Sequence, residues 1–118
     1  MAVTASRTIQ LLFSGDITEN IIQSAADNTT SSAKTDLVTL ALGANTITPP
    51  SVSGITIVGL TIIPPAGNSS LITLKGVTGD TGVAIHKTDP TTIALDSTFV
   101  SLVLNAAASI VGVRLIWS

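Results

Sequence analysis

Short apolar runs rich in Val, Ile, Thr and Leu dominate the chain, and Gly, Pro, Asn and Asp interrupt them at short intervals. This pattern is typical of β-strands joined by turns. We expect strands near 7–13, 17–24, 36–42, 45–48, 55–63, 70–75, 82–87, 91–95, 98–104 and 109–117. About nine or ten short strands without intervening helical patterns predict an all-β fold, an antiparallel β-sandwich or a jelly roll. The length of 118 residues fits a single domain of this kind over 1–118.

One segment also fits a helix. Asp16 and Glu19 have the spacing of a capping box, and apolar residues follow them. We favour a strand over 17–24, because β-branched residues such as Ile21 are stiff at χ1 and suit a pleated surface. It would be entered through a hairpin turn at 14–16. The stretch 27–35 is polar and predicts a loop.

Two runs carry the most apolar side chains. In 109–117, alternation predicts one face made by Val111, Val113, Leu115 and Trp117, with Arg114 opposite. The run 55–63 is apolar on both faces, with Ile55, Ile57 and Ile63 on one and Val58, Leu60 and Ile62 on the other. A two-layer sandwich covers only one face of each sheet. We therefore take Val58, Leu60, Ile62 and Trp117 as candidate interface residues.

Composition narrows the classes of function. Only 10% of the residues are charged, against roughly 25% in ordinary soluble domains. The five basic residues are widely separated and the net charge is −2, so no basic stripe for nucleic acid exists. The sequence has no cysteine, which excludes disulfides and thiol chemistry. We see neither a signal peptide nor a membrane span, because the most apolar stretches fall short of the ~20 residues that a span needs.

The segment LKGVTGDTGVAIH, residues 74–86, contains Gly76, Gly79 and Gly82, one carboxylate, Asp80, and the only histidine, His86. Phosphate binding would need a helix after the glycines, but a strand pattern follows. Calcium would need several carboxylates, and only Asp80 and Asp89 lie nearby. We interpret the segment as a strand connection in which Gly79 and Gly82 adopt positive φ and Asp80 binds its own backbone. We expect no metal and no cofactor.

Catalysis finds no support in the sequence. A catalytic triad needs a base, and His86 has no partner pattern around it. The carboxylates are scattered over predicted turns, so a paired-carboxylate glycosidase has nothing in its favour. We expect no enzyme. Sugar binding on exposed aromatic rings is an alternative, with Phe13, Phe99 and Trp117 as the available rings, although the strand phase of Trp117 favours a core or interface position.

Three segments resemble a group of small β-rich proteins carried by tailed bacteriophages: LALGANTITPP (40–50), TIIPPAGNSS through TTIALD (61–96) and VGVRLIWS (111–118). The resemblance covers most of 36–118 and contains no catalytic signature. It implies a virion structural protein, foremost a capsid-decorating (cement) protein that stabilises the particle. The alternatives are a tail, neck or fibre component, or a small carbohydrate-binding β-sandwich.

Low charge and a strand that is apolar on both faces also predict self-association. Exposing such a strand would leave an apolar patch that monomers rarely tolerate. We expect a homo-oligomer, with a trimer favoured, and contact with the major capsid protein or another virion protein. Identical copies usually close into a symmetric assembly.

Overall fold

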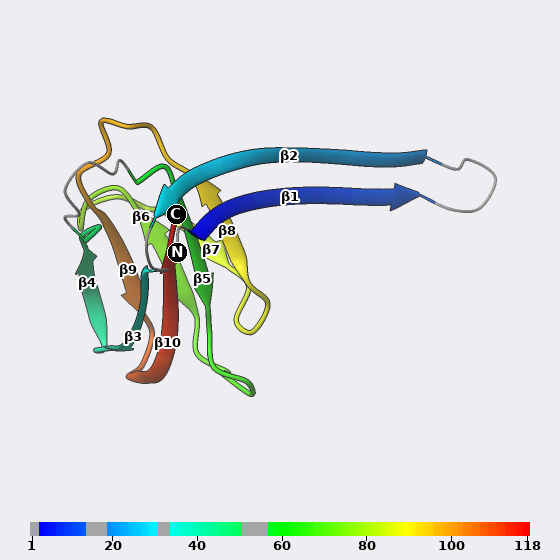
Figure 1. Cartoon of the computed structure of the whole chain (residues 1–118). Helices are drawn as coiled ribbons and strands as arrows, with labels where there is room; N and C mark the ends of the chain where they lie inside the picture. Colours follow the sequence, from blue (N-terminus) through cyan, green and yellow to red (C-terminus); the bar gives the residue numbers. More distant parts are fainter. Residues whose placement is uncertain (1–2, 14–18, 31–33, 51–56) are drawn as a thin grey trace.

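The computed structural model describes residues 3–13, 19–30, 34–50 and 57–118 (Figure 1). Within these ranges the chain is all-β and contains no helix. The strands are β1 (Val3–Phe13), β2 (Glu19–Thr30), β3 (Lys34–Leu40), β4 (Gly43–Ile47), β5 (Gly59–Ile63), β6 (Ile72–Lys75), β7 (Val83–Ile85), β8 (Thr91–Ala94), β9 (Leu102–Ala106) and β10 (Ile110–Trp117). The predicted all-β class is confirmed.

Strands β3 to β10 form two four-stranded antiparallel sheets, in the orders β3-β10-β5-β8 and β4-β9-β6-β7. The pairing is nested: the first of these eight strands lies next to the last, the second next to the seventh, the third next to the sixth and the fourth next to the fifth. A long ribbon of paired strands that folds over on itself gives this order, which is that of a jelly roll. Of the two predicted architectures, an antiparallel β-sandwich and a jelly roll, the strand order is that of the jelly roll.

The core lies between the two sheets. One sheet contributes inward residues from β3, β5 and β10, and the other contributes them from β4, β6 and β9. The buried set is Leu40, Ile47, Leu60, Ile62, Ile72, Leu102, Leu104, Ala106, Ile110, Val113, Leu115 and Trp117. Strands β5 and β10 bury alternate side chains, as strands with one solvated face do, apart from the register shift at Gly112. Strand β9 is buried on both faces, because Leu102, Val103 and Leu104 are buried in succession.

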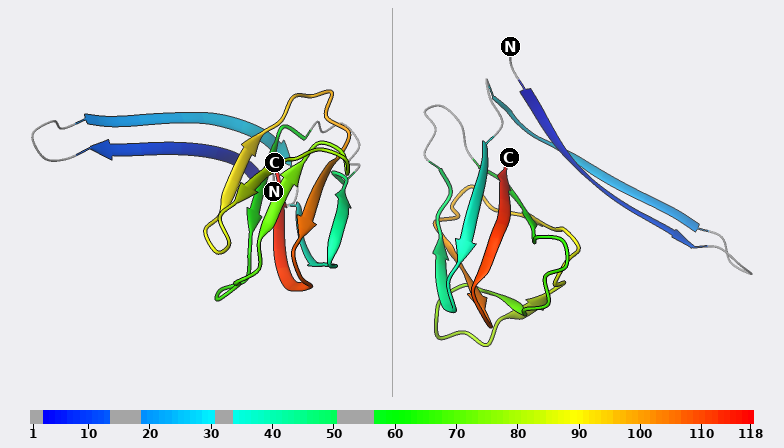
Figure 2. Two further views of the ribbon diagram at one scale, coloured as in Figure 1. Left: turned by 180° about the vertical axis from the view of Figure 1, so that it is seen from behind. Right: turned by 90° about the horizontal axis from the view of Figure 1, so that it is seen from below.

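Strands β1 and β2 pair with each other and with no other described strand. They form an antiparallel hairpin that extends away from the sandwich (Figures 1 and 2). We refer to it as the arm. The strand prediction for 17–24 is confirmed over 19–24 against the helix alternative, while residues 17–18 and the predicted turn at 14–16 lie outside the described residues. The polar loop expected over 27–35 is wrong at both ends, because β2 continues to Thr30 and β3 begins at Lys34.

The arm also changes the domain description. We expected one sandwich over 1–118, but the first two strands belong to neither of its sheets. The radius of gyration is 15.7 Å, whereas a compact chain of this length has about 13.5 Å. The difference follows from the extended arm.

Candidate functional site

The glycine-rich connection between β6 and β7 is closed by its own carboxylate. Oδ2 of Asp80 accepts hydrogen bonds from the backbone N–H of Gly76 at 3.2 Å and of Val77 at 3.0 Å. The Asp80 N–H in turn donates to the carbonyl of Val77 at 3.1 Å. The predicted structural role of Asp80 is therefore confirmed: the carboxylate holds a turn, as short polar side chains do in such loops.

The two glycines expected to need positive φ differ. Gly82 has φ +76°, and a Cβ there would lie 2.6 Å from the carbonyl oxygen of Leu74 and 2.6 Å from Cγ of Lys75. Only glycine fits this position. Gly79 is not in the left-handed region, and nothing lies within 4 Å of its Cβ position. The expectation was right for Gly82 and wrong for Gly79.

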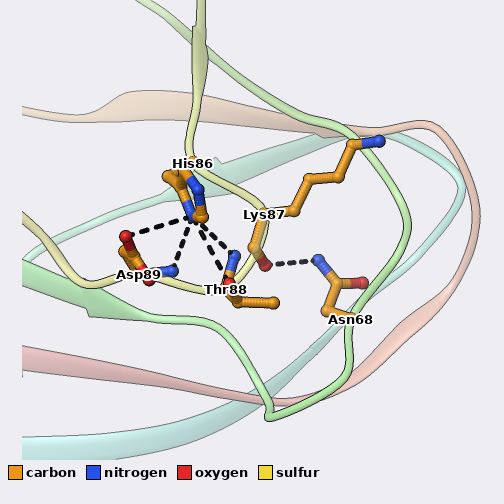
Figure 3. A network of polar contacts seen from close by, with 5 residues as sticks. All are labelled: Asn68, His86, Lys87, Thr88 and Asp89. Atoms are coloured by element: carbon orange, nitrogen blue, oxygen red, sulfur yellow. Dashed lines mark hydrogen bonds and ion pairs between the residues drawn. The ribbon is translucent and has the colours of Figure 1, made fainter.

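His86 follows β7 and binds the backbone of the next turn (Figure 3). Its Nδ1 accepts the N–H of Asp89 at 2.9 Å and that of Thr88 at 3.2 Å. An accepting Nδ1 places the ring proton on Nε2. The side chain is 61% exposed, and Oδ2 of Asp89 lies 3.6 Å from Nδ1. The geometry is that of a turn-capping residue at the surface.

Two asparagines, Asn45 and Asn68, hold connections between strands in place through hydrogen bonds to the backbone. Nδ2 of Asn68 donates to the carbonyl of Lys87 at 2.8 Å, which ties the turn after β5 to the turn after β7 (Figure 3). Asn45 binds both backbone groups of Ala41, and its Nδ2 also donates to the carbonyl of Leu104 at 3.1 Å. Asn68 and Asn45 therefore stabilise the turns in which they lie, and Asn45 also links β4 to β9.

Asp96 holds the turn after β8. Its Oδ2 accepts the hydroxyl of Thr98 at 2.5 Å and the N–H of Thr98 at 3.0 Å. The pKa of the Asp96 carboxyl is held below its ordinary value of 3.8, because hydrogen bonds stabilise the ionised form. The hydroxyl of Thr98 is the largest cause, and backbone hydrogen bonds add to it. The group is fully exposed, so this is a local effect at a surface turn.

Three of the four predicted interface residues lie inside the sandwich. Leu60, Ile62 and Trp117 are buried in the core, and Val58 is half-buried one step before Leu60. Trp117 packs against Phe99 with ring centroids 6.5 Å apart. The interface assignment is therefore corrected: alternation had grouped the right residues, but this is the inward face.

The outward face of the β3-β10-β5-β8 sheet carries two of the exposed apolar residues of the described chain, and the others, Leu42, Leu71, Val77, Val83 and Val100, lie elsewhere. Leu37 of β3 and Val111 of β10 are each 71% exposed. Leu37 pairs with Arg114, which is also exposed, and half-buried Ile63 lies beside Arg114 on β5. Around them the sheet presents threonines, at Thr35, Thr39, Thr61 and Thr92. We call this surface the outer face.

Val111 was expected on the same face as Val113, and the structure contradicts this. The register of β10 against β3 shifts between Val111 and Val113, at Gly112 with φ +86°. This β-bulge reverses the alternation, so Val111 points outward while Val113 stays in the core. A glycine inside a strand pattern is a known sign of a bulge and could have shown the reversal in the sequence. Leu37 was detectable too, since it alternates with buried Leu40 and half-buried Val38.

Comparisons with known proteins give no assignment. No protein-family model matches the chain, and neither curated proteins nor solved structures provide a match. Among the described residues, no group of three or more His, Asp or Glu side chains has the arrangement of a metal site. That part of the chain also holds no helix long and apolar enough to cross a membrane.

Proposed function

We propose that the protein is a structural component of a bacteriophage virion, foremost a capsid-decorating protein that binds the capsid lattice and stabilises the particle. The observation that carries the proposal is the nested order of the eight sandwich strands. Jelly rolls of this kind form capsid proteins of viruses as well as lectin domains. The sequence resemblance over 36–118 points to the same source.

The polar contacts of the sandwich support this class. Asp80, His86, Asn45, Asn68 and Asp96 each bind nearby backbone and hold a connection in place. A decorating protein gains from such turns, because it must persist outside the cell and act by covering a surface. Its working parts are then an exposed sheet face and an extended arm.

Sugar binding has no comparable support. The two aromatic rings of the described sandwich, Phe99 and Trp117, pack against each other, and Trp117 is only 4% exposed. Neither ring is presented as a platform on which a sugar could stack. The fold is shared with lectin domains, but the aromatic residues of the described sandwich give the lectin alternative no ring on which a sugar could stack.

The test is the location and copy number of the chain in purified particles. For a decorating protein, quantitative mass spectrometry should give a copy number of the same order as that of the major capsid protein. Electron microscopy should place its density on the outside of the shell. Particles lacking the gene should assemble and then lose DNA on heating sooner than complete particles. A few copies at one vertex would assign it to the tail or neck, and its absence from particles would refute the proposal.

A further inference from the structure

The arm lacks the support that a two-stranded sheet needs. Its strands of 11 and 12 residues pair only with each other among the described strands. At about 3.4 Å per residue, strands of this length reach on the order of 37 Å. An isolated two-stranded hairpin is marginally stable at best in water and is normally stabilised by a third strand or a packed layer. Figure 2 shows the arm extending clear of the sandwich.

The solvent-accessible area of the chain is also larger than that of a compact monomer, as expected if the arm packs against a partner. The chain exposes 7222 Å². A compact monomer of its mass, 11.9 kDa, exposes about 5,900 Å². The excess is therefore about 1,300 Å², while each partner in a standard protein interface buries about 800 Å². The chain carries enough surplus surface for one specific interface.

The register of the arm makes one of its two faces more apolar than the other. Directly paired residues of an antiparallel hairpin share a face. Ile9 pairs with Gln23, and Leu11 pairs with Ile21, so Ile9, Leu11 and Ile21 occupy positions on the same face. Two charged positions flank them on this face: Glu19, paired with Phe13 at the far end of the arm, and Arg7, paired with Ala25 toward the other end. An apolar face on each side of a contact is what sheet-on-sheet packing requires.

The outer face of the sandwich suits this arm. It carries exposed Leu37 and Val111 and an exposed cation, Arg114, and the acidic position of the arm face, Glu19, is opposite to Arg114 in charge. Every copy of the chain presents both an uncovered arm and an uncovered outer face. A contact from the arm of one copy to the outer face of the next would cover both in each copy. Contacts of this head-to-tail kind form a ring where the rotation between copies closes and an open filament where it does not.

We propose that the arm of one copy packs across the outer face of a second copy and that this contact builds the oligomer. The two surfaces form a three-layer arrangement in which Leu37 and Val111 become buried. The trimer favoured from the sequence is one such closed ring. The proposal concerns the isolated protein and does not depend on the assignment to a virion.

Chemical cross-linking tests the placement directly, since the natural chain has no cysteine. A Leu11→Cys variant is mixed with a Val111→Cys variant and treated with a short bismaleimide. We expect a cross-linked dimer of the two variants. The matched control replaces the second partner with Val100→Cys, a valine that is 76% exposed and lies outside the outer face, and should give only background. Equal yield in both mixtures would overturn the placement.

Light scattering tests the assembly itself. Leu37→Lys places a charge in the proposed contact and should weaken self-association at least about tenfold, which is the effect of losing one central interface residue. Val100→Lys should leave it unchanged. Circular dichroism checks that both variants fold. A full-length protein that is monomeric at tens of micromolar, or an oligomer unaffected by Leu37→Lys, would refute the proposal. An intact oligomer on a protein absent from particles would refute only the virion function.

Discussion

Replacing Gly82 with alanine should destabilise the sandwich more than the same change at any other described glycine. At φ +76° an alanine pays about 1–2 kcal/mol for the left-handed conformation. Its Cβ would also lie 2.6 Å from the Leu74 carbonyl oxygen, which is backbone and cannot move alone. Leu74 pairs with Val83, the residue after Gly82. Relief of the clash therefore costs strand hydrogen bonds of about 1 kcal/mol each.

The sum is a loss of about 3 kcal/mol in the free energy of unfolding. For a chain of 118 residues the unfolding entropy is about 0.25 kcal/mol/K, so the melting temperature should fall by about 12 °C. Thermal unfolding followed by circular dichroism measures this. Gly67 and Gly79 also lie in loops, and they separate the cost of the positive φ from the cost of the steric clash, because Gly67 lacks the clash and Gly79 lacks both.

Gly67 has φ +77° and nothing within 4 Å of its Cβ position, so Gly67→Ala should cost only the conformational part, about 1–2 kcal/mol. Gly79 has neither feature, so Gly79→Ala should change stability by no more than about 0.5 kcal/mol. A Gly82→Ala variant no worse than Gly67→Ala would show that the steric argument is wrong. A Gly79→Ala variant worse than both would refute the loop conformation itself.

Three further predictions concern polar side chains. Asn45→Ala should cost about 1–3 kcal/mol in urea unfolding, because it leaves the carbonyl of Leu104 without its side-chain donor and releases the turn before β4; an unchanged midpoint would contradict this. Asp80→Asn should lower the free energy of unfolding by less than about 1 kcal/mol, since an amide oxygen can accept the same backbone hydrogen bonds. If the loss is larger, and if excess chelator destabilises the natural protein by a similar amount, Asp80 binds a metal instead. Asp96 has a lowered pKa, so its contribution should be present at neutral pH and fade as the pH falls below 3.8 through the folded-state value. Unfolding midpoints of the natural chain and of Asp96→Ala should therefore converge in acid, and a gap that widened there would reverse the assigned sign.

The local pattern of the sequence was sufficient for the positions of most strands and for the two faces of β5. Alternation grouped Leu60 with Ile62, and Leu115 with Trp117, and each pair lies on one side of its sheet. It also identified Asp80 as a turn residue. These features are decided within a few residues, because a strand has a period of two and a turn depends on its own backbone angles.

Periodicity defines two faces and leaves open which of them is inward. The apolar face of β5 that we assigned to a partner is the one that meets the opposite sheet. That choice depends on the neighbours of β5, which are β10 and β8, and both lie far along the chain. The bulge at Gly112 similarly reversed Val111 through its pairing with β3.

Strand order and the independence of the arm were also decided by tertiary structure. The first sandwich strand, β3, pairs with the last, β10, and no local signal in either strand names its partner. Nothing in the composition of 3–30 separates it from the strands of the sandwich, yet its two strands pair only with each other among those described. The sequence by itself determined where most strands form and which residues alternate within an unbroken register. The order of the strands, and with it the face that stays exposed, was decided only when the nested ribbon folded and its two sheets each buried one face against the other.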